Sequence, residues 1–133
     1  MKLLTLLLAV TLLGACGARS SDESQVRELI DAVETAGEAR DASDVLEHVA
    51  RGYSDSQGFD KTQLQNFLRG YFLAHPKIEL LVGIENLEFP VEGLGRARVT
   101  LTSLPAGDRA TLQVEFRRED GDWRVLRADQ IRE

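Results

Sequence analysis

The stretch KIELLVGIENLEFPVEGLGRARVTLTS, residues 77–103, decides the fold because its apolar side chains recur at every second position. A period of two is typical of a strand with one face toward a core. The first apolar run is Ile78, Leu80, Val82 and Ile84, and the second is Leu87, Phe89 and Val91. The parity changes between the two runs, which is what a β-bulge produces. The pattern therefore predicts one long, bent strand with a bulge at Glu85-Asn86.

Three more strands follow by the same alternation. The expected inward positions are Ala97, Val99 and Leu101 in the second strand, and Ala110, Leu112, Val114 and Phe116 in the third. Asp120-Gly121 is a strong signal for a two-residue hairpin turn, so the fourth strand is expected to start near Trp123. Strands joined by such short turns are antiparallel neighbours. We therefore predict a bent, four-stranded antiparallel sheet.

Upstream of the sheet, three segments have apolar residues at helical spacing. The expected inward residues are Val26, Leu29, Ile30 and Val33 in the first helix, Val45, Leu46 and Val49 in the second, and Leu64, Phe67, Leu68, Tyr71 and Phe72 in the third. A capping box at Ser20 and Glu23 is predicted for the first helix, and one at Asp60 and Gln63 for the third. Pro76 ends the third helix because the residue before a proline disfavours helical dihedrals.

Helices followed by strands in a chain of 133 residues indicate one α+β domain. We expect three N-terminal helices packed on a curved, cone-like four-stranded antiparallel sheet over residues 22–133. In this order, EARDASDVLEHVARGYSDSQGFDKTQLQNFLRGYF (38–72) and EDGDWRV (119–125) resemble the nuclear transport factor 2-like, or cystatin-like, superfamily. The chain is similar in particular to small bacterial lipoproteins of uncharacterised function. The resemblance implies a pocket inside the cone, and it implies no particular reaction.

The N-terminus has the anatomy of a secretory signal. Lys2 precedes an apolar run over residues 3–13, which is too short to span a bilayer. Leu13-Gly14-Ala15-Cys16 then closely resembles the lipobox of bacterial lipoproteins. This resemblance implies a lipoprotein signal peptide over residues 1–15 and lipid attachment at Cys16, by a diacylglyceryl group on its sulfur and an acyl chain such as palmitate on its freed amine. Residues 16–21 would form a short linker.

The alternative at the N-terminus is an ordinary secreted protein with one free thiol, which is a liability in an oxidising compartment. The several acyl chains of a lipoprotein hold it firmly, whereas one chain binds a membrane only marginally. Gly17, in place of aspartate, favours sorting to the outer membrane of a Gram-negative cell by the same resemblance. We therefore expect a protein anchored in the bacterial cell envelope, at the periplasmic face of the outer membrane.

The charge balance argues against nucleic acid as a partner. The chain carries 22 acidic and 16 basic residues, and the acidic excess lies before residue 96. Binding to phosphates requires clustered lysine and arginine, which this sequence lacks. Solvated helix faces and acidic residues near helix N-termini explain the acidic half.

The residue pattern also argues against acid–base catalysis and a metal. A general base must face the pocket to reach its proton, yet the inward positions of the two central strands are all apolar. The only histidines, His48 and His75, are too far apart for a metal-ligand spacing, and no cysteine remains to join them after lipidation. We expect His48 to be exposed, and we predict no catalytic residue, no metal and no cofactor.

The candidate pocket residues are Tyr53, Tyr71, His75, Trp123 and Arg127. Tyr53 is expected at the pocket mouth, near Asp55, which is expected to bind its own backbone in a turn. His75 either contributes to the pocket or ends the third helix, where the helix dipole favours it. If the hairpin keeps a regular register, Val114 pairs with Arg127, and Arg127 then lies on the core face. A bulge after Val125 would instead send Arg127 outward and turn its neighbours Leu126 and Ala128 inward.

Three functions are compatible with this sequence. The leading hypothesis is a membrane-anchored, non-enzymatic module that binds a small apolar or weakly anionic molecule, with Tyr71 and Trp123 on its body and Arg127 on its acidic end. The alternative is an accessory protein whose cone is filled by its own side chains and which docks on an envelope protein partner. The third is a small enzyme that uses Tyr53, Tyr71 or His75. The pattern makes no prediction of oligomeric state.

Overall fold

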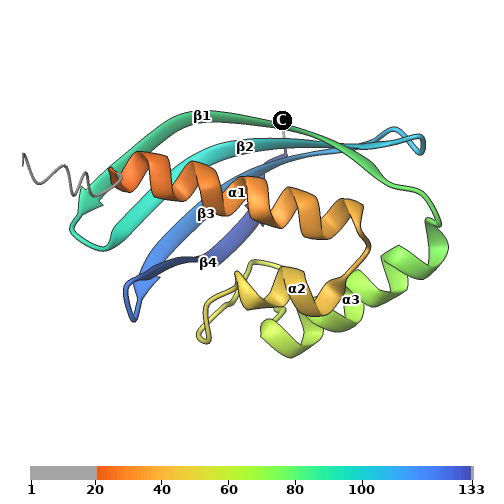
Figure 1. The fold of residues 1–133 in the computed structure, drawn as a ribbon, viewed down its shortest axis with the longest axis horizontal. Helices are drawn as coiled ribbons and strands as arrows, with labels where there is room; N and C mark the ends of the chain where they lie inside the picture. Colours follow the sequence, from red (N-terminus) through yellow and green to blue (C-terminus); the bar gives the residue numbers. More distant parts are fainter. Residues whose placement is uncertain (1–20, 133) are drawn as a thin grey trace, which may run out of the picture.

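The computed structural model describes residues 21–132, which form three helices and four strands. The helices are α1 (Asp22–Glu38), α2 (Ala42–Glu47) and α3 (Lys61–Ala74), and the strands are β1 (Glu79–Val91), β2 (Leu94–Leu104), β3 (Asp108–Glu119) and β4 (Asp122–Gln130) (Figure 1). The strands make one antiparallel sheet in the order β1-β2-β3-β4. The predicted α+β class and the three helices are confirmed. None of the helices in this described part is long and apolar enough to cross a membrane.

Side-chain caps fix the starts of α1 and α3. Asp60 and Gln63 form the predicted capping box at the start of α3. The cap of α1 is Ser21, whose hydroxyl accepts a hydrogen bond of 3.1 Å from the backbone N of Ser24. The capping box predicted to start at Ser20 is therefore wrong by one residue, because α1 begins directly after Ser21. Ser20 itself lies outside the described residues.

Strand β1 bends at the predicted bulge. Its register with β2 shifts after Glu85, where Asn86 takes a positive φ of 55°. Leu87 and Phe89 consequently pack against the core, as the change of parity predicts. A second register shift before Val91 turns that side chain outward, where it is 56% exposed. The predicted inward position of Val91 is therefore wrong.

The β3–β4 hairpin turns at the two predicted residues. Asp120 and Gly121 have φ values of 50° and 86°, the left-handed conformation that a type I′ turn needs. Trp123 opposes Arg118 in this hairpin and is buried together with Phe116. The predicted burial of Trp123 on the face of Phe116 is confirmed.

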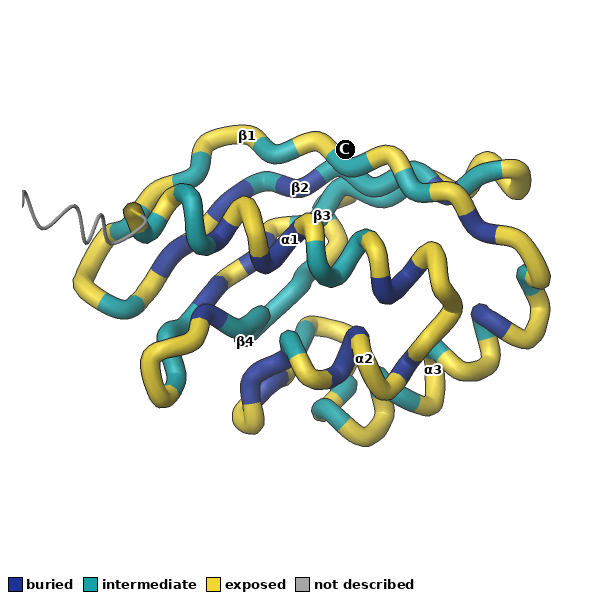
Figure 2. Tube along the Cα trace, in the orientation of Figure 1, coloured by how far each residue is buried: buried dark blue, intermediate teal, exposed yellow. Residues whose placement is uncertain are grey.

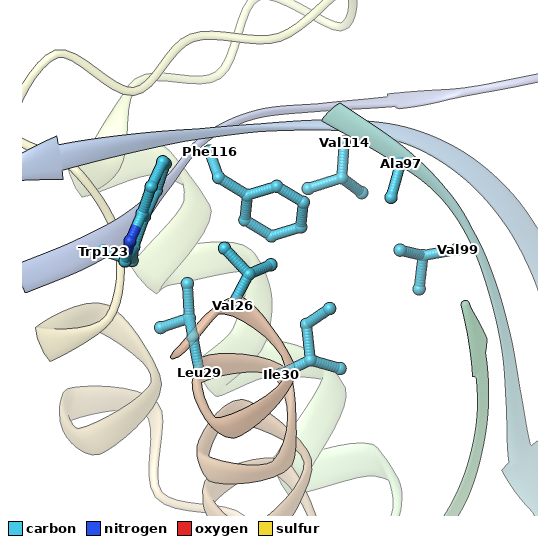
Figure 3. Packing of buried hydrophobic residues seen from close by; sticks show 8 residues of the cluster. All are labelled: Val26, Leu29, Ile30, Ala97, Val99, Val114, Phe116 and Trp123. Atoms are coloured by element: carbon cyan, nitrogen blue, oxygen red, sulfur yellow. The ribbon is translucent and has the colours of Figure 1, made fainter. Parts of the chain in front are cut away.

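Helix α1 lies along the curved sheet and fills its inner face (Figure 1). We define the main core by eight buried side chains, shown in Figure 3: Val26, Leu29, Ile30, Ala97, Val99, Val114, Phe116 and Trp123. Val26 and Phe116 are fully buried. Burying one such apolar side chain contributes about 1.5–3 kcal/mol, so this contact between α1 and the sheet is a principal source of stability. Figure 2 shows the buried positions along α1, β2 and β3, whereas β1 has none.

A second core joins α2 and α3 to the segment that leads into β1. Its buried members are Ala36, Ala42, Val45, Leu46, Val49, Tyr53, Phe72 and Ile78. Val33 and Val125 pack against both cores, which are therefore continuous. In α3 only Phe72 is buried, because the helix packs mainly against α2. Phe67, predicted to face inward, is 52% exposed.

The chain that leaves α2 runs along the outer edge of β4. Val49 pairs with Val125 in a parallel bridge. The backbone N of Ala50 donates to the carbonyl of Val125, and the backbone N of Val125 donates to the carbonyl of His48, each at 2.8 Å. These bonds fasten the loop after α2 to the sheet and bring Tyr53 into the second core.

Candidate functional site

The five predicted pocket residues do not come together in one site. Trp123 lies in the main core, whereas Tyr53 lies in the second core. Tyr71 and His75 stack on each other at the C-terminal end of α3, and Arg127 lies on the outer face of the sheet. The pocket predicted between Tyr71, Trp123 and Arg127 is therefore not formed. Near Trp123, side chains of α1 occupy the inner face of the sheet.

A bulge in β4 sets the orientation of Arg127. Phe116 opposes Val125, but the next residue back in β3, Glu115, opposes Arg127, because one extra residue is inserted in β4 at this point. The insertion moves Arg127 to the outer face and turns Ala128 toward the core, where it packs. Of the two alternatives left by the sequence, the one with Arg127 facing the core is wrong.

Arg127 pairs with Asp129, two residues further along β4. Its Nε donates to one carboxylate oxygen of Asp129, and the backbone N of Ser56 donates to the other at 2.7 Å. Burial raises the pKa of Asp129, but these hydrogen bonds outweigh burial and hold it below its ordinary value. The Arg127 side chain is 39% exposed. The pair fastens the loop after α2 to the sheet, so its role is structural.

Tyr53 stands in the same loop and is 4% exposed. Its hydroxyl donates to Asp55 at 2.8 Å. The other carboxylate oxygen of Asp55 accepts from the backbone N of Gln57 and of Phe59, so the predicted turn role of Asp55 is confirmed. Burial and then the hydrogen bond to Asp55 raise the pKa of Tyr53 well above its ordinary value. A phenol held neutral and engaged in this way positions the loop.

Tyr71, His75 and Asp108 form a polar cluster at the far end of α3. His75 caps the helix, its Nδ1 lies 2.8 Å from the carbonyl oxygen of Tyr71, and the two rings stack at 4.0 Å. The Tyr71 hydroxyl donates to Asp108 at 2.9 Å, and His75 Nε2 lies 3.8 Å from the same oxygen. Burial, followed by the bond to Asp108, raises the pKa of Tyr71, and Ser103 partly offsets this rise. Asp108 is 60% exposed, so the cluster lies at the surface and not inside the cone.

A cleft of about 750 Å³ lies between α1, the end of α2 and the β3–β4 hairpin. We call it the Trp123 cleft, and its lining residues are Gln25, Glu28, Leu29, Ala32, Glu47, His48, Gly121, Asp122, Trp123 and Arg124. Trp123 is the single predicted pocket residue that lines it. His48, expected to be exposed, is half-buried here. The volume is in the range of small-molecule sites.

Trp123, which lines this cleft, has a buried polar atom without a partner in the described chain. The side chain is 6% exposed, and its Nε1 is buried without a hydrogen-bond partner in the described chain. The ring centroids of Trp123 and Phe89 lie 5.5 Å apart in an edge-to-face arrangement. The guanidinium carbon of Arg118 lies 5.0 Å from the centroid of the Trp123 ring. Figure 3 shows the indole nitrogen at the lower edge of the ring, on the side where α2 passes. A buried donor left unpaired costs about 1–3 kcal/mol.

The charges around the cleft are mainly negative. Glu28, Glu47 and Asp122 are exposed, and within residues 21–132 none of the three forms an ion pair. The one guanidinium, that of Arg124, donates to the backbone carbonyl of Glu47. In the same described range, no group of histidine, cysteine, aspartate or glutamate side chains could hold a metal ion.

The sequence pattern missed this cleft because its residues sit on the polar flanks of separate elements. Gln25, Glu28 and Ala32 recur three and four residues apart along α1, beside the buried Leu29. That spacing was the one available signal, and a solvated helix face gives the same pattern. The partners from α2 and the hairpin are brought to it only by the tertiary fold.

The fold is the cystatin-like, nuclear transport factor 2-like fold, as the sequence resemblance implies. Among solved structures, a domain of unknown function from Nostoc punctiforme with this fold is 13% identical; the match covers 86% of this chain and 78% of that one, with a TM-score of 0.70. An uncharacterised cystatin-like protein from Caulobacter vibrioides is 19% identical; the match covers 81% of this chain and 87% of that one, with a TM-score of 0.65. A nuclear transport factor 2-like protein of unknown function from Shewanella oneidensis is 13% identical; the match covers 83% of this chain and 98% of that one, with a TM-score of 0.64.

No protein-family model and no curated protein matches the chain. The structural likenesses, all under 20% identical, establish the fold alone. The predicted signal peptide over residues 1–15 and the predicted lipid attachment at Cys16 lie outside the described residues.

Proposed function

We propose that this protein is a lipid-anchored module of the bacterial cell envelope that binds a small molecule in the Trp123 cleft without transforming it. The carrying observation is that Trp123 lines the cleft and that its buried Nε1 lacks a partner in the described chain. A ligand oxygen that accepts a hydrogen bond from this N–H would remove the cost of leaving it unpaired. The cleft volume of about 750 Å³ also lies in the range of small-molecule sites.

The anchor is supported by the lipobox-like Leu13-Gly14-Ala15-Cys16. Helix α1 begins at Asp22, so the segment between it and Cys16 reaches about 20 Å at most when extended. The domain is therefore held near the bilayer surface, and Gly17 favours the periplasmic face of the outer membrane.

The proposed site differs from the one expected inside the cone. An acidic ligand head was expected to meet Arg127, but Arg127 lies on the outer face and is paired with Asp129. Binding without catalysis is supported by the apolar inner positions of the central strands and by the surface position of the Tyr71, His75 and Asp108 cluster.

The second candidate is an accessory protein with a filled cone that docks on an envelope protein. The packing of α1 against the sheet favours it, since Val26, Leu29 and Ile30 occupy the inner face. A test of small-molecule binding separates the two candidates.

Because the chain has a single tryptophan, its indole N–H gives one nuclear magnetic resonance signal, which comes from a residue that lines the cleft. We would label the mature protein with ¹⁵N-tryptophan in detergent micelles and titrate a fragment collection with neutral, cationic and anionic members. Binding fragments should move this signal downfield as the donor gains an acceptor. If no fragment at millimolar concentration moves it in the folded protein, the binding proposal fails and docking becomes the better explanation.

The anchor is tested by growing cells with a labelled fatty acid. Label should enter the wild-type protein and be absent from Cys16→Ser, which should persist as an uncleaved precursor. Equal labelling of the two proteins would overturn the lipoprotein assignment.

A further inference from the structure

We infer that the ligand of the Trp123 cleft is a small organic cation with a hydroxyl or carbonyl oxygen close to its charged nitrogen, the chemistry of an amino sugar or amino alcohol. This inference rests on the proposed function and specifies its ligand. It replaces the apolar or weakly anionic molecule that a pocket around Arg127 would have taken.

The positive charge follows from the unpaired carboxylates. Other acidic residues near this end of the molecule are neutralised, Asp22 by Arg118 and Glu119 by Arg117. Glu28, Glu47 and Asp122 have no such partner within the described chain and come from three different elements around the opening. Arg124, the one guanidinium in the lining, offsets one of these three charges, so the lining keeps a net negative charge that attracts a cation and repels an anion.

The oxygen follows from Trp123. Its Nε1 is a donor only, so a group that satisfies it must supply a lone pair, and an ammonium group cannot do so. The ligand therefore needs an acceptor together with its cation. Because Nε1 is covered in the free protein, we expect a neighbouring side chain to move aside when the ligand oxygen reaches the indole.

The size and lining favour an organic cation over a metal ion. The described residues hold no grouping that could chelate a metal, and a cleft of about 750 Å³ far exceeds an ion. Leu29 and Ala32 give the lining an apolar strip next to the polar groups. A ring with one apolar face and several hydroxyls, as in an amino sugar, matches this combination.

The experiment titrates the ¹⁵N-tryptophan-labelled mature protein with four probes of similar size: glucosamine, N-acetylglucosamine, glucose and cyclohexylamine. Glucosamine has both the charge and the oxygens, the two neutral sugars lack the charge, and cyclohexylamine lacks the oxygen. We expect glucosamine to bind at least about five-fold more tightly than the neutral sugars, because several weak attractions to exposed carboxylates add up. Glucosamine should move the indole signal downfield, and cyclohexylamine should not.

Two variants and a control assign the contacts. Binding to the variants is measured by calorimetry, because Trp123→Phe has no indole signal. Glu28→Gln should weaken glucosamine binding by about two- to five-fold, and Trp123→Phe should weaken it by about five-fold through loss of the donor. Glu92→Gln removes an exposed carboxylate from the β1–β2 turn that does not line the cleft, and should leave binding unchanged.

If the neutral sugars bind as tightly as glucosamine, or if Glu28→Gln and Glu92→Gln lose equal glucosamine affinity, the inference that the ligand is a cation is wrong. Because those neutral probes would still bind at Trp123, the proposed function would survive that result. If only anionic or apolar fragments move the indole signal, the cation inference is wrong while the cleft remains a binding site. If nothing moves it, both proposals fail.

Discussion

Replacing Trp123 by alanine should destabilise the domain by about 3–5 kcal/mol, the range for large aromatic truncations in a core. The side chain is 6% exposed and closes the main core beside Phe116. Its edge contact with Phe89 adds about 0.5–1.5 kcal/mol, and the Arg118 guanidinium over the ring adds about 0.5–1 kcal/mol. Loss of the unpaired N–H acts in the opposite direction, by about 1–3 kcal/mol.

The added contacts with Phe89 and Arg118 and the relief of the unpaired N–H largely cancel. The expected loss of stability therefore stays within the range for the truncation alone. Trp123→Phe is the matched control. It keeps an aromatic ring against Phe89 and removes the unpaired donor, so its cost should be no more than about 1.5 kcal/mol. Both variants lose the unpaired N–H, so the difference between them measures the packing of the ring.

The assay is urea denaturation followed by far-ultraviolet circular dichroism, since both variants remove the only fluorescent tryptophan. Equal m-values in the three proteins would show that the midpoints compare one transition. A loss under about 1 kcal/mol in Trp123→Ala would refute the placement of this side chain in the core. A loss well above about 1.5 kcal/mol in Trp123→Phe would refute the claim that the nitrogen is a cost.

Two further predictions concern the helix start and the loop. Asp60→Ala removes the acceptor of the α3 capping box and should cost about 1 kcal/mol in urea denaturation, whereas Asp60→Asn, which keeps an acceptor, should cost clearly less; equal losses would contradict a capping role. The folded pKa of Asp129 lies below its unfolded value, so the stability it contributes is present above about pH 4 and is lost as pH falls through the folded pKa. Urea midpoints of the wild type and Asp129→Asn should therefore differ at neutral pH and converge toward pH 3, and a constant difference would exclude this linkage.

The two β-bulges show why one part of the sheet was predictable and another was not. Around Glu85 and Asn86 the apolar parity changes clearly on either side, so burial allows only a bulge. After Val125 the regular register would place Arg127 inward, whereas a bulge turns Leu126 and Ala128 inward, and the local sequence is compatible with both. The choice there depends on pairing along β3 and on the hydrogen bonds of the loop beside β4, which the local sequence does not display.

The candidate site was less predictable than the fold because it depends on distant elements. Helix periodicity identified the residues of α1 that pack on the sheet, including Leu29. The same periodicity cannot tell that Glu28, on the adjacent flank, comes to face Glu47 and the hairpin. Phe67 was misplaced for a related reason: its helical face is apolar, but α3 leans on α2 and leaves that part of the face uncovered.

The two outer strands of the sheet differ in how they resist pairing with another chain. Strand β4 is covered along its edge by the segment at Val49 and Ala50. Strand β1 has no such backbone cover from the described residues. The backbone N of Leu80 donates to the Glu38 carboxylate, and the edge is interrupted by the bulge at Asn86 and by Pro90, which has no N–H to donate. Chains tethered to one bilayer, the arrangement we propose, meet each other at high local concentration. A regular exposed edge would there pair with the edge of a neighbouring molecule and start aggregation. The irregularity of β1 opposes such pairing between molecules on the membrane.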